Sequence, residues 1–245
     1  MTALPPAVTS LRSRLDELGW VKDLLVAGSL ATGDYVPGVS DLDLVAIVDG
    51  PVDAVREAAL VDLHQGLDSG PAAGAQLGCA YVAESTIPLL DAVHPTWTHA
   101  QFVHRRLSGI ARAELVHHGF AVCGRPPGAV LPPMTDDQVR AAARAELAGY
   151  WAWASRRPWM WLDPVIADLG LTAMARGRYT MRTGRLLTKT EAIEQAHAPD
   201  WLVDQLRARR RGDRVASPRL RTGWIAWRDA RRTIGALGGH PPVLG

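Results

Sequence analysis

The chain has few cysteines, no long apolar run and almost no net charge. Two cysteines occur among 245 residues, and neither has the spacing of a metal ligand, so we expect both to be free thiols in a reducing compartment. No apolar stretch reaches about 18 residues, and the first residues show no signal-peptide pattern. These absences predict a cytoplasmic protein with no membrane span.

The charge and the histidines exclude two further classes of site. A formal net charge of +2 is too small to indicate a nucleic-acid-binding surface, so a nucleic-acid partner is not expected. Eight histidines are present, but none falls in an HExxH pattern or another ligand spacing. The hydrophobic fraction of 47% is that of an ordinary globular protein. What the chain does must therefore be sought in local motifs.

Hydrophobic periodicity divides the chain into a mixed half and a helical half. The pattern predicts strands over 21–27, 42–48, 77–83 and 120–123, and helices over 5–19, 52–67 and 98–118. After Pro132 and Pro133 the strand signals vanish and only helical segments follow. We predict an α+β fold in which a mixed sheet flanked by helices (1–127) precedes an all-helical domain (128–245).

One stretch, 28–48, carries the strongest chemical signal. Gly28 and Ser29 follow an apolar run, and Asp41 and Asp43 open the next one after a short loop that ends in Ser40. In a strand, alternate residues share a face, so the two carboxylates should project together and favour a bound cation. Mg²⁺ prefers such oxygen ligands together with substrate phosphates, which backbone N–H groups of a Gly-Ser turn contact well. The stretch predicts a site for a metal and a nucleotide.

This order of a strand, Gly-Ser, a loop, Asp-x-Asp and a second strand resembles the nucleotidyltransferase superfamily typified by DNA polymerase β. The stretch from Arg176 to Ala192 resembles the helical C-terminal domain of the aminoglycoside adenylyltransferases that act on streptomycin and spectinomycin. The resemblance implies that residues 1–127 form a nucleotidyltransferase domain that uses Mg²⁺ and ATP. It also implies that Arg176 and Lys189 bind the ATP phosphates, as Gly28, Ser29 and Ser40 do from the first domain.

The third carboxylate of that family lies on the next strand, where this chain has Gly78. In the family this acid acts as general base on the acceptor hydroxyl or as a further metal ligand, and a positioned base contributes roughly 10² to 10⁴-fold to the rate. Glu84 is the nearest acid and shares the strand face of Gly78, but six residues of strand span about 20 Å. Asp68 and Asp91 are alternatives on loops. We take Glu84 as the candidate base, beside the metal ligands Asp41 and Asp43.

The leading hypothesis is an enzyme of antibiotic resistance that moves AMP from ATP to a hydroxyl of a small acceptor. The resemblance makes an aminoglycoside the default acceptor. Two alternatives stay open: an antitoxin-like protein adenylyltransferase, and a non-catalytic nucleotide-binding regulator that has lost its third carboxylate. We expect a monomer or a weak dimer.

Overall fold

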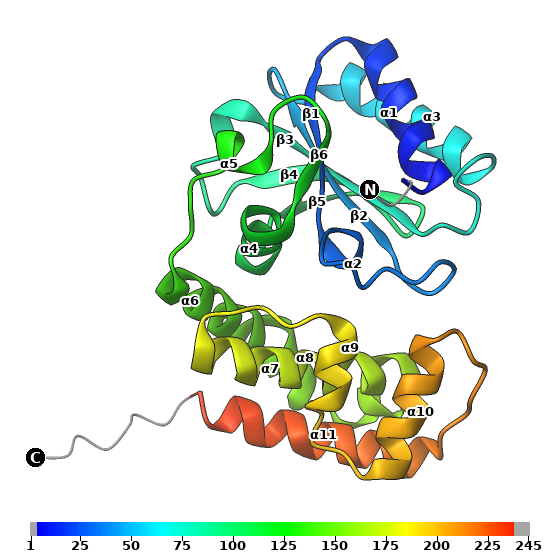
Figure 1. The fold of residues 1–245 in the computed structure, drawn as a ribbon, viewed down its shortest axis with the longest axis vertical. Coiled ribbons are helices and arrows are strands. Elements are labelled where there is room, and N and C mark those ends of the chain that lie inside the picture. The colour runs from blue at the N-terminus through cyan, green and yellow to red at the C-terminus, as the bar shows by residue number, and fades with distance from the viewer. Residues whose placement is uncertain (1–3, 238–245) are drawn as a thin grey trace, which may run out of the picture. The chain divides into compact units, whose positions relative to one another are not determined.

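The computed structural model describes residues 4–237 and divides the chain into two compact units (Figure 1). Unit 1 extends to Met134 and unit 2 begins at Thr135. The predicted boundary at 127/128 falls short of this point, because α5 (Pro127–Val130) and Leu131 still pack into the core of unit 1. The last eight residues of the predicted second domain lie outside the described residues.

Unit 1 is built on a mixed sheet of six strands in the order β5-β4-β3-β2-β1-β6. Only β2 and β3 run parallel, and every other neighbouring pair is antiparallel. In the parallel pair Asp43 is opposite Gly78 and Val48 is opposite Ala83, so β2 and β3 begin at the same end of the sheet. The strands are β1 (Val21–Val26), β2 (Leu42–Val48), β3 (Leu77–Ala83), β4 (Val93–Thr98), β5 (Gln101–Arg106) and β6 (Phe120–Cys123).

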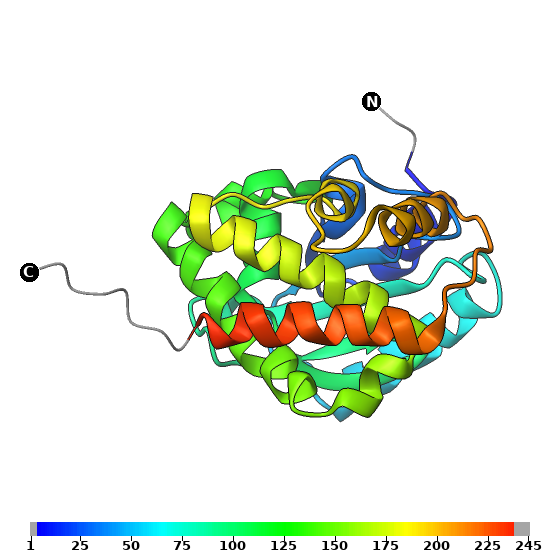
Figure 2. The same ribbon diagram turned by 90° about the horizontal axis from the view of Figure 1, so that it is seen from below.

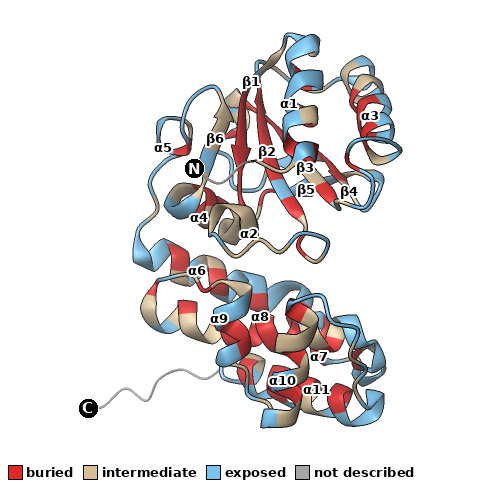
Figure 3. Cartoon of the chain, turned by 45° about the vertical axis from the view of Figure 1, so that its right-hand side comes forward, coloured by how far each residue is buried: buried red, intermediate tan, exposed pale blue. Residues whose placement is uncertain are grey.

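Helices cover both faces of this sheet because its central strands are apolar on both sides. One face packs on α1 (Pro6–Leu18) and α3 (Ala54–Asp68), and its core includes Leu11, Leu44 and Leu63. The other face carries Val45 and Ile47 and packs on α4 (Gly109–His118) and α5. Figure 3 shows these central strands as the most buried part of the unit. The α+β prediction for this half is confirmed.

The helix predicted over 98–118 is wrong in its first half. Residues 93–106 form the hairpin of β4 and β5, and the helix begins only at Gly109, after Ser108, whose hydroxyl accepts a hydrogen bond from the Ala111 N–H. The hairpin turns at His99 and Ala100, both with positive φ. Such turns normally contain Asn-Gly, and the absence of that signal left the hairpin unpredicted.

A buried aromatic group lies between α3 and the sheet. His64 is fully buried, its ring stacks on Trp97 with centroids 5.0 Å apart, and its Nε2 is 2.7 Å from the Tyr81 hydroxyl. Burial lowers the pKa of His64 from 6.5 to about 3, so the folded protein holds this histidine neutral.

We expect this histidine to make unit 1 less stable in acid. His64 binds a proton below about pH 6.5 in the unfolded chain, whereas in the folded chain it stays neutral down to about pH 3. The free energy of unfolding should therefore fall by about 1.4 kcal/mol per pH unit below pH 6 through this group alone. Urea unfolding at pH 6 and pH 4.5 measures the loss, and His64→Gln should lose correspondingly less. An equal loss in the two proteins would contradict the assignment.

Unit 2 consists of helices, as predicted. Its longest helices, α8 and α11, lie side by side, and Figure 2 shows α11 in red along α8 in yellow-green. Its core includes Trp161, Leu171 and Met174 of the region before and within α8. The elements are α6 (Asp136–Glu146), a π-helical turn (Leu147–Trp151), α7 (Ala152–Ser155), a 3₁₀ segment (Pro158–Leu162), α8 (Pro164–Thr183), α9 (Lys189–Glu194), α10 (Asp200–Arg210) and α11 (Arg219–Gly235).

Membrane-spanning helices are not found in residues 4–237, since no helix there combines the necessary length and apolar character.

Candidate active site

Gly28 and Asp43, both in the predicted motif of residues 28–48, are in direct contact. Gly28 begins the short helix α2 (Gly28–Ala31) directly after β1, with φ of +60°. The Ala27 N–H donates a hydrogen bond of 2.9 Å to the Asp43 carbonyl, which holds this turn against β2. A Cβ atom at Gly28 would overlap the Asp43 carboxylate. Glycine is therefore required here for both its backbone conformation and its close approach.

Asp41 and Asp43 line one cavity of about 340 Å³. The cavity lies at the end of the sheet where β2 and β3 begin, beside the β4–β5 turn. Asp43 is exposed and Asp41 half-buried. The side chains and backbone around it come from Asp41, Asp43, Asp68, Ala72, Gly74, Gln76, Leu77, Gly78, Thr98, His99, Ala100 and Arg105.

The charges in this cavity suit a divalent cation. Three carboxylates and one guanidinium, with His99 neutral, leave a formal charge of −2. Within residues 4–237 no three acidic, histidine or cysteine side chains are close enough to hold a metal together. A cation here would have Asp41 and Asp43 as its protein ligands and phosphate oxygens for the rest, which is how Mg²⁺ is usually bound. The residues present therefore fit Mg²⁺.

Ser29 lies within α2, and Ser40 lies in the loop that connects α2 to β2. Ser40 is buried, and its hydroxyl accepts a hydrogen bond of 3.0 Å from the Val36 N–H. Ser29 follows Gly28 in α2, and its carbonyl accepts a hydrogen bond of 2.9 Å from the Asp34 N–H. These hydrogen bonds of Ser29 and Ser40 fix the backbone between Gly28 and Asp41.

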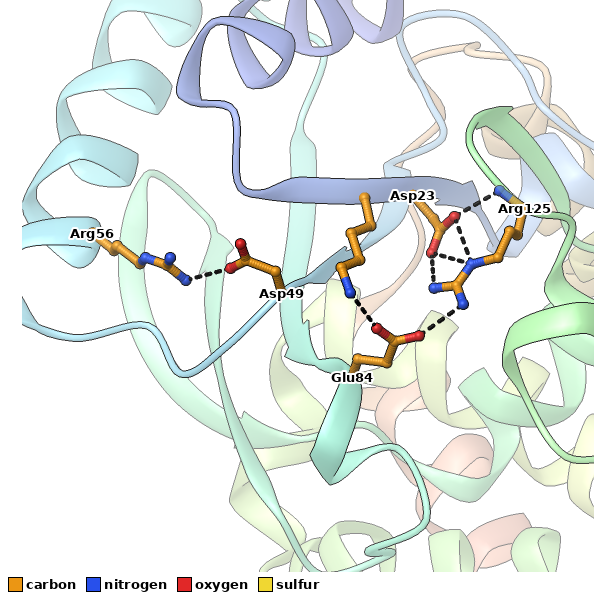
Figure 4. A network of polar contacts seen from close by, with 6 residues as sticks. Asp23, Asp49, Arg56, Glu84 and Arg125 are labelled. Carbon is orange, nitrogen blue, oxygen red and sulfur yellow. Dashed lines mark hydrogen bonds and ion pairs between the residues drawn. The ribbon is translucent and has the colours of Figure 1, made fainter.

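Glu84 lies at the opposite end of β3 from the aspartates, in a 3₁₀ turn (Glu84–Thr86). Its carboxylate contacts Lys22 at 2.6 Å and Arg125 at 2.7 Å, and Arg125 also binds the buried Asp23 (Figure 4). The hydrogen bonds from Lys22 and then Arg125 lower the pKa of Glu84. The structure does not bring the predicted base together with Asp41 and Asp43.

Arg176 on α8 and Lys189 on α9 both belong to unit 2. Arg176 is half-buried on α8, and its Nε donates a hydrogen bond of 2.9 Å to the Leu187 carbonyl. Lys189 is the first residue of α9, after a capping box formed by Thr188 and Glu191. Their predicted contact with phosphates stays a prediction.

Sequence reasoning missed the strained backbone around the cavity. Among residues 4–237, Gln76, His99 and Ala100 are the non-glycine residues with positive φ, at 48°, 50° and 56°. All of them line the cavity that contains Asp41 and Asp43. Each such conformation costs about 1–3 kcal/mol, and costs of this kind concentrate at functional sites. None of these three positions is itself a glycine or an asparagine, the residues that usually adopt such a φ.

Two of the acids named from the sequence as alternatives also have clear positions. Asp68, the last residue of α3, lines the cavity and accepts a hydrogen bond of 3.1 Å from the indole Nε1 of Trp97. Asp91 is exposed and pairs with Arg106 at 3.0 Å, outside the cavity. Arg105 was not singled out from the sequence, and it supplies the cavity's positive charge.

Comparison with known proteins finds one matching domain family and a similar solved structure. Residues 8–72 match the family model of the nucleotidyltransferase domain, a stretch that contains Gly28, Asp41 and Asp43. No curated protein matches the chain in sequence. Among solved structures, the chain is similar to the spectinomycin adenyltransferase AAD(9) from Enterococcus faecialis, crystallised with ATP and spectinomycin.

That similarity has a TM-score of 0.69 and covers 93% of this chain and 98% of the adenyltransferase, at 14% sequence identity. The two proteins therefore share their fold over nearly their whole length. The chain therefore contains a nucleotidyltransferase domain, which indicates an enzyme. It resembles the aminoglycoside adenylyltransferases.

Proposed function

We propose that the protein transfers AMP from ATP to a hydroxyl of a small acceptor and releases pyrophosphate. The observation that carries the proposal is the close approach of Gly28 to the carboxylate of Asp43, which lines a cavity together with Asp41. This contact brings the Gly28–Ser29 turn, which we propose binds phosphate, next to the pair of carboxylates within the segment that matches the nucleotidyltransferase domain. Adenylyl transfer needs both parts at one place.

We assign each site residue a role from the chemistry of its side chain or backbone. Backbone N–H groups at Gly28 and Ser29 contact the β- and γ-phosphates, and Ser40 fixes the loop before Asp41. Asp41 and Asp43 would hold Mg²⁺, which when bound offsets negative charge on the phosphates. Arg176 and Lys189 supply further positive charge for the triphosphate and the leaving pyrophosphate. The acceptor hydroxyl attacks the α-phosphorus in line with the departing pyrophosphate.

An aminoglycoside or aminocyclitol is the acceptor that we propose to test first. The support is the shared fold with an adenyltransferase whose crystal structure holds ATP and spectinomycin. The cytoplasmic location, the lack of a nucleic-acid partner and the monomeric or weakly dimeric state stay predictions.

The proposal is tested by pyrophosphate release from ATP and Mg²⁺ with a panel that includes spectinomycin and streptomycin. We expect release only when an acceptor is present. AMP that becomes attached to a protein added as partner would instead select a protein adenylyltransferase. Bound ATP without pyrophosphate release, for every acceptor, would contradict the enzymatic proposal and favour a nucleotide-binding regulator.

A further inference from the structure

The cavity holds a third carboxylate that does not come from β3. We propose that the acceptor hydroxyl enters this cavity and that Asp68, positioned by Trp97, is the general base that removes its proton. The inference rests on the proposed function. It replaces Glu84, which the sequence suggested, with an acid delivered by the end of helix α3.

The other candidate acids are placed where they cannot serve this cavity. Glu84 is held by Lys22 and Arg125 at the far end of β3. Asp91 is 88% exposed and pairs with Arg106. Asp68 lines the same cavity as Asp41 and Asp43.

Gly78 leaves room for a base that comes from elsewhere. It lies opposite Asp43 in the parallel register and lines the cavity. A Cβ atom there would meet only ordinary contacts, at 3.6 Å from the Leu42 and Trp97 carbonyls. The missing side chain therefore leaves open space in the cavity that Asp43 and Asp68 also line.

Asp68 sits where a carboxylate is locally unfavourable. It is the last residue of α3, and a negative charge in the last turn of a helix typically costs about 0.3–1 kcal/mol. The Trp97 indole donates a hydrogen bond of 3.1 Å to Asp68 Oδ2, which offsets that cost and fixes the carboxylate's direction. An unfavourable charge that is held by a dedicated donor is typical of a functional residue.

Trp97 is itself rigid, so its hydrogen bond is a precise constraint. The ring is 2% exposed and stacks on His64 at an interplanar angle of 9°. His64 in turn contacts the Tyr81 hydroxyl at 2.7 Å. Tyr81, His64 and Trp97 thus connect β3, α3 and β4 in one packed group. Trp97 in turn holds the Asp68 carboxylate, which lines the cavity.

The geometry favours a base over a third metal ligand, since no three acids of the described residues form a metal group. In the reaction, the Asp68 carboxylate accepts the proton of the acceptor hydroxyl as its oxygen bonds to the α-phosphorus. The bond from that phosphorus to the oxygen bridging to the β-phosphate breaks, and pyrophosphate leaves with the electron pair. Asp68 then releases the proton to water.

The test compares Asp68→Asn with the wild type in pyrophosphate release with ATP, Mg²⁺ and the acceptor panel. We expect kcat to fall by roughly 10² to 10⁴-fold while the KM for ATP stays within about twofold, because in this proposal Asp68 contacts the acceptor and neither the metal nor the nucleotide. Asp91→Asn, which removes an exposed acid outside the cavity, should keep the wild-type rate.

Trp97→Phe separates positioning from folding. The substitution keeps an aromatic ring against His64 but removes the donor to Asp68, so we expect kcat to fall about 10- to 100-fold. In the Asp68→Asn background the same substitution should cause no further loss, because its effect runs through Asp68. An additive loss in the double variant would overturn the positioning role.

Failure of this inference is distinguishable from failure of the proposed function. If the wild type releases pyrophosphate with an acceptor and Asp68→Asn matches its kcat, the assignment of the base is overturned and the proposed function stands. If the wild type binds ATP but releases no pyrophosphate with any acceptor, both are overturned.

Discussion

Asp43→Asn should lower the rate of adenylyl transfer by at least about 10³-fold without unfolding the protein. The carboxylate is exposed, lies against Gly28 and lines the cavity with Asp41, so in the proposed site it is one of the two metal ligands. Loss of one metal-binding charge removes several kcal/mol of transition-state stabilisation, and about 4 kcal/mol corresponds to 10³-fold. Pyrophosphate release measures the rate, and urea unfolding checks the fold.

Asp49→Asn is the matched control for this substitution. Asp49 follows the same strand, but at its other end, where it pairs with Arg56 at 2.9 Å (Figure 4). We expect wild-type activity and a stability change below about 1 kcal/mol, since the pair is partly exposed. Equal rates for Asp43→Asn and Asp49→Asn would contradict the metal-site assignment.

Asp229→Ala should destabilise unit 2 by about 3–5 kcal/mol. Asp229 on α11 has a side chain that is 2% exposed, and Arg178 on α8 donates a hydrogen bond of 2.7 Å to its Oδ1. Arg178 also binds Thr233 at 2.6 Å, so it is anchored at this point. Removing one partner leaves a mostly buried, uncompensated charge between the two longest helices. Urea unfolding followed by tryptophan fluorescence measures the loss.

Two variants show whether burial causes this effect. Asp204→Ala removes the exposed partner of Arg207 in the same unit, and should cost less than about 1 kcal/mol. The double variant Arg178→Met, Asp229→Leu should recover most of the stability, because it leaves no charge behind. A loss of under 1 kcal/mol in Asp229→Ala would refute the uncompensated-charge argument.

The first strands and their motif could be predicted because their signals are local. The apolar runs that become β1 and β2 lie on either side of Gly28 and Asp41, and strand alternation alone places Asp41 and Asp43 on one face. The contact between Gly28 and Asp43 follows from antiparallel pairing of those neighbouring strands. The helical second half could also be predicted, because strand signals vanish after Pro132 and Pro133 and only helical periodicity follows.

The rest of the site depends on contacts between distant segments. The β4–β5 hairpin turns at His99 and Ala100, which carry no turn signature, so it was taken for part of a helix. With the hairpin missing, Trp97 could not be placed beside α3, and Asp68 was one loop acid among several. Asp68 lies at the end of a helix, so no fixed sequence spacing connects it to the Asp-x-Asp motif. Sequence reasoning therefore favoured Glu84, which follows the next strand.

The most direct measurement is the mass of the acceptor after incubation with the full chain, ATP and Mg²⁺. We predict an acceptor heavier by one AMP, formed by the wild type and absent with Asp41→Asn, together with an equal amount of pyrophosphate. The account is contradicted if ATP is bound without any AMP adduct on acceptor or protein, or if Asp41→Asn forms the adduct as fast as the wild type.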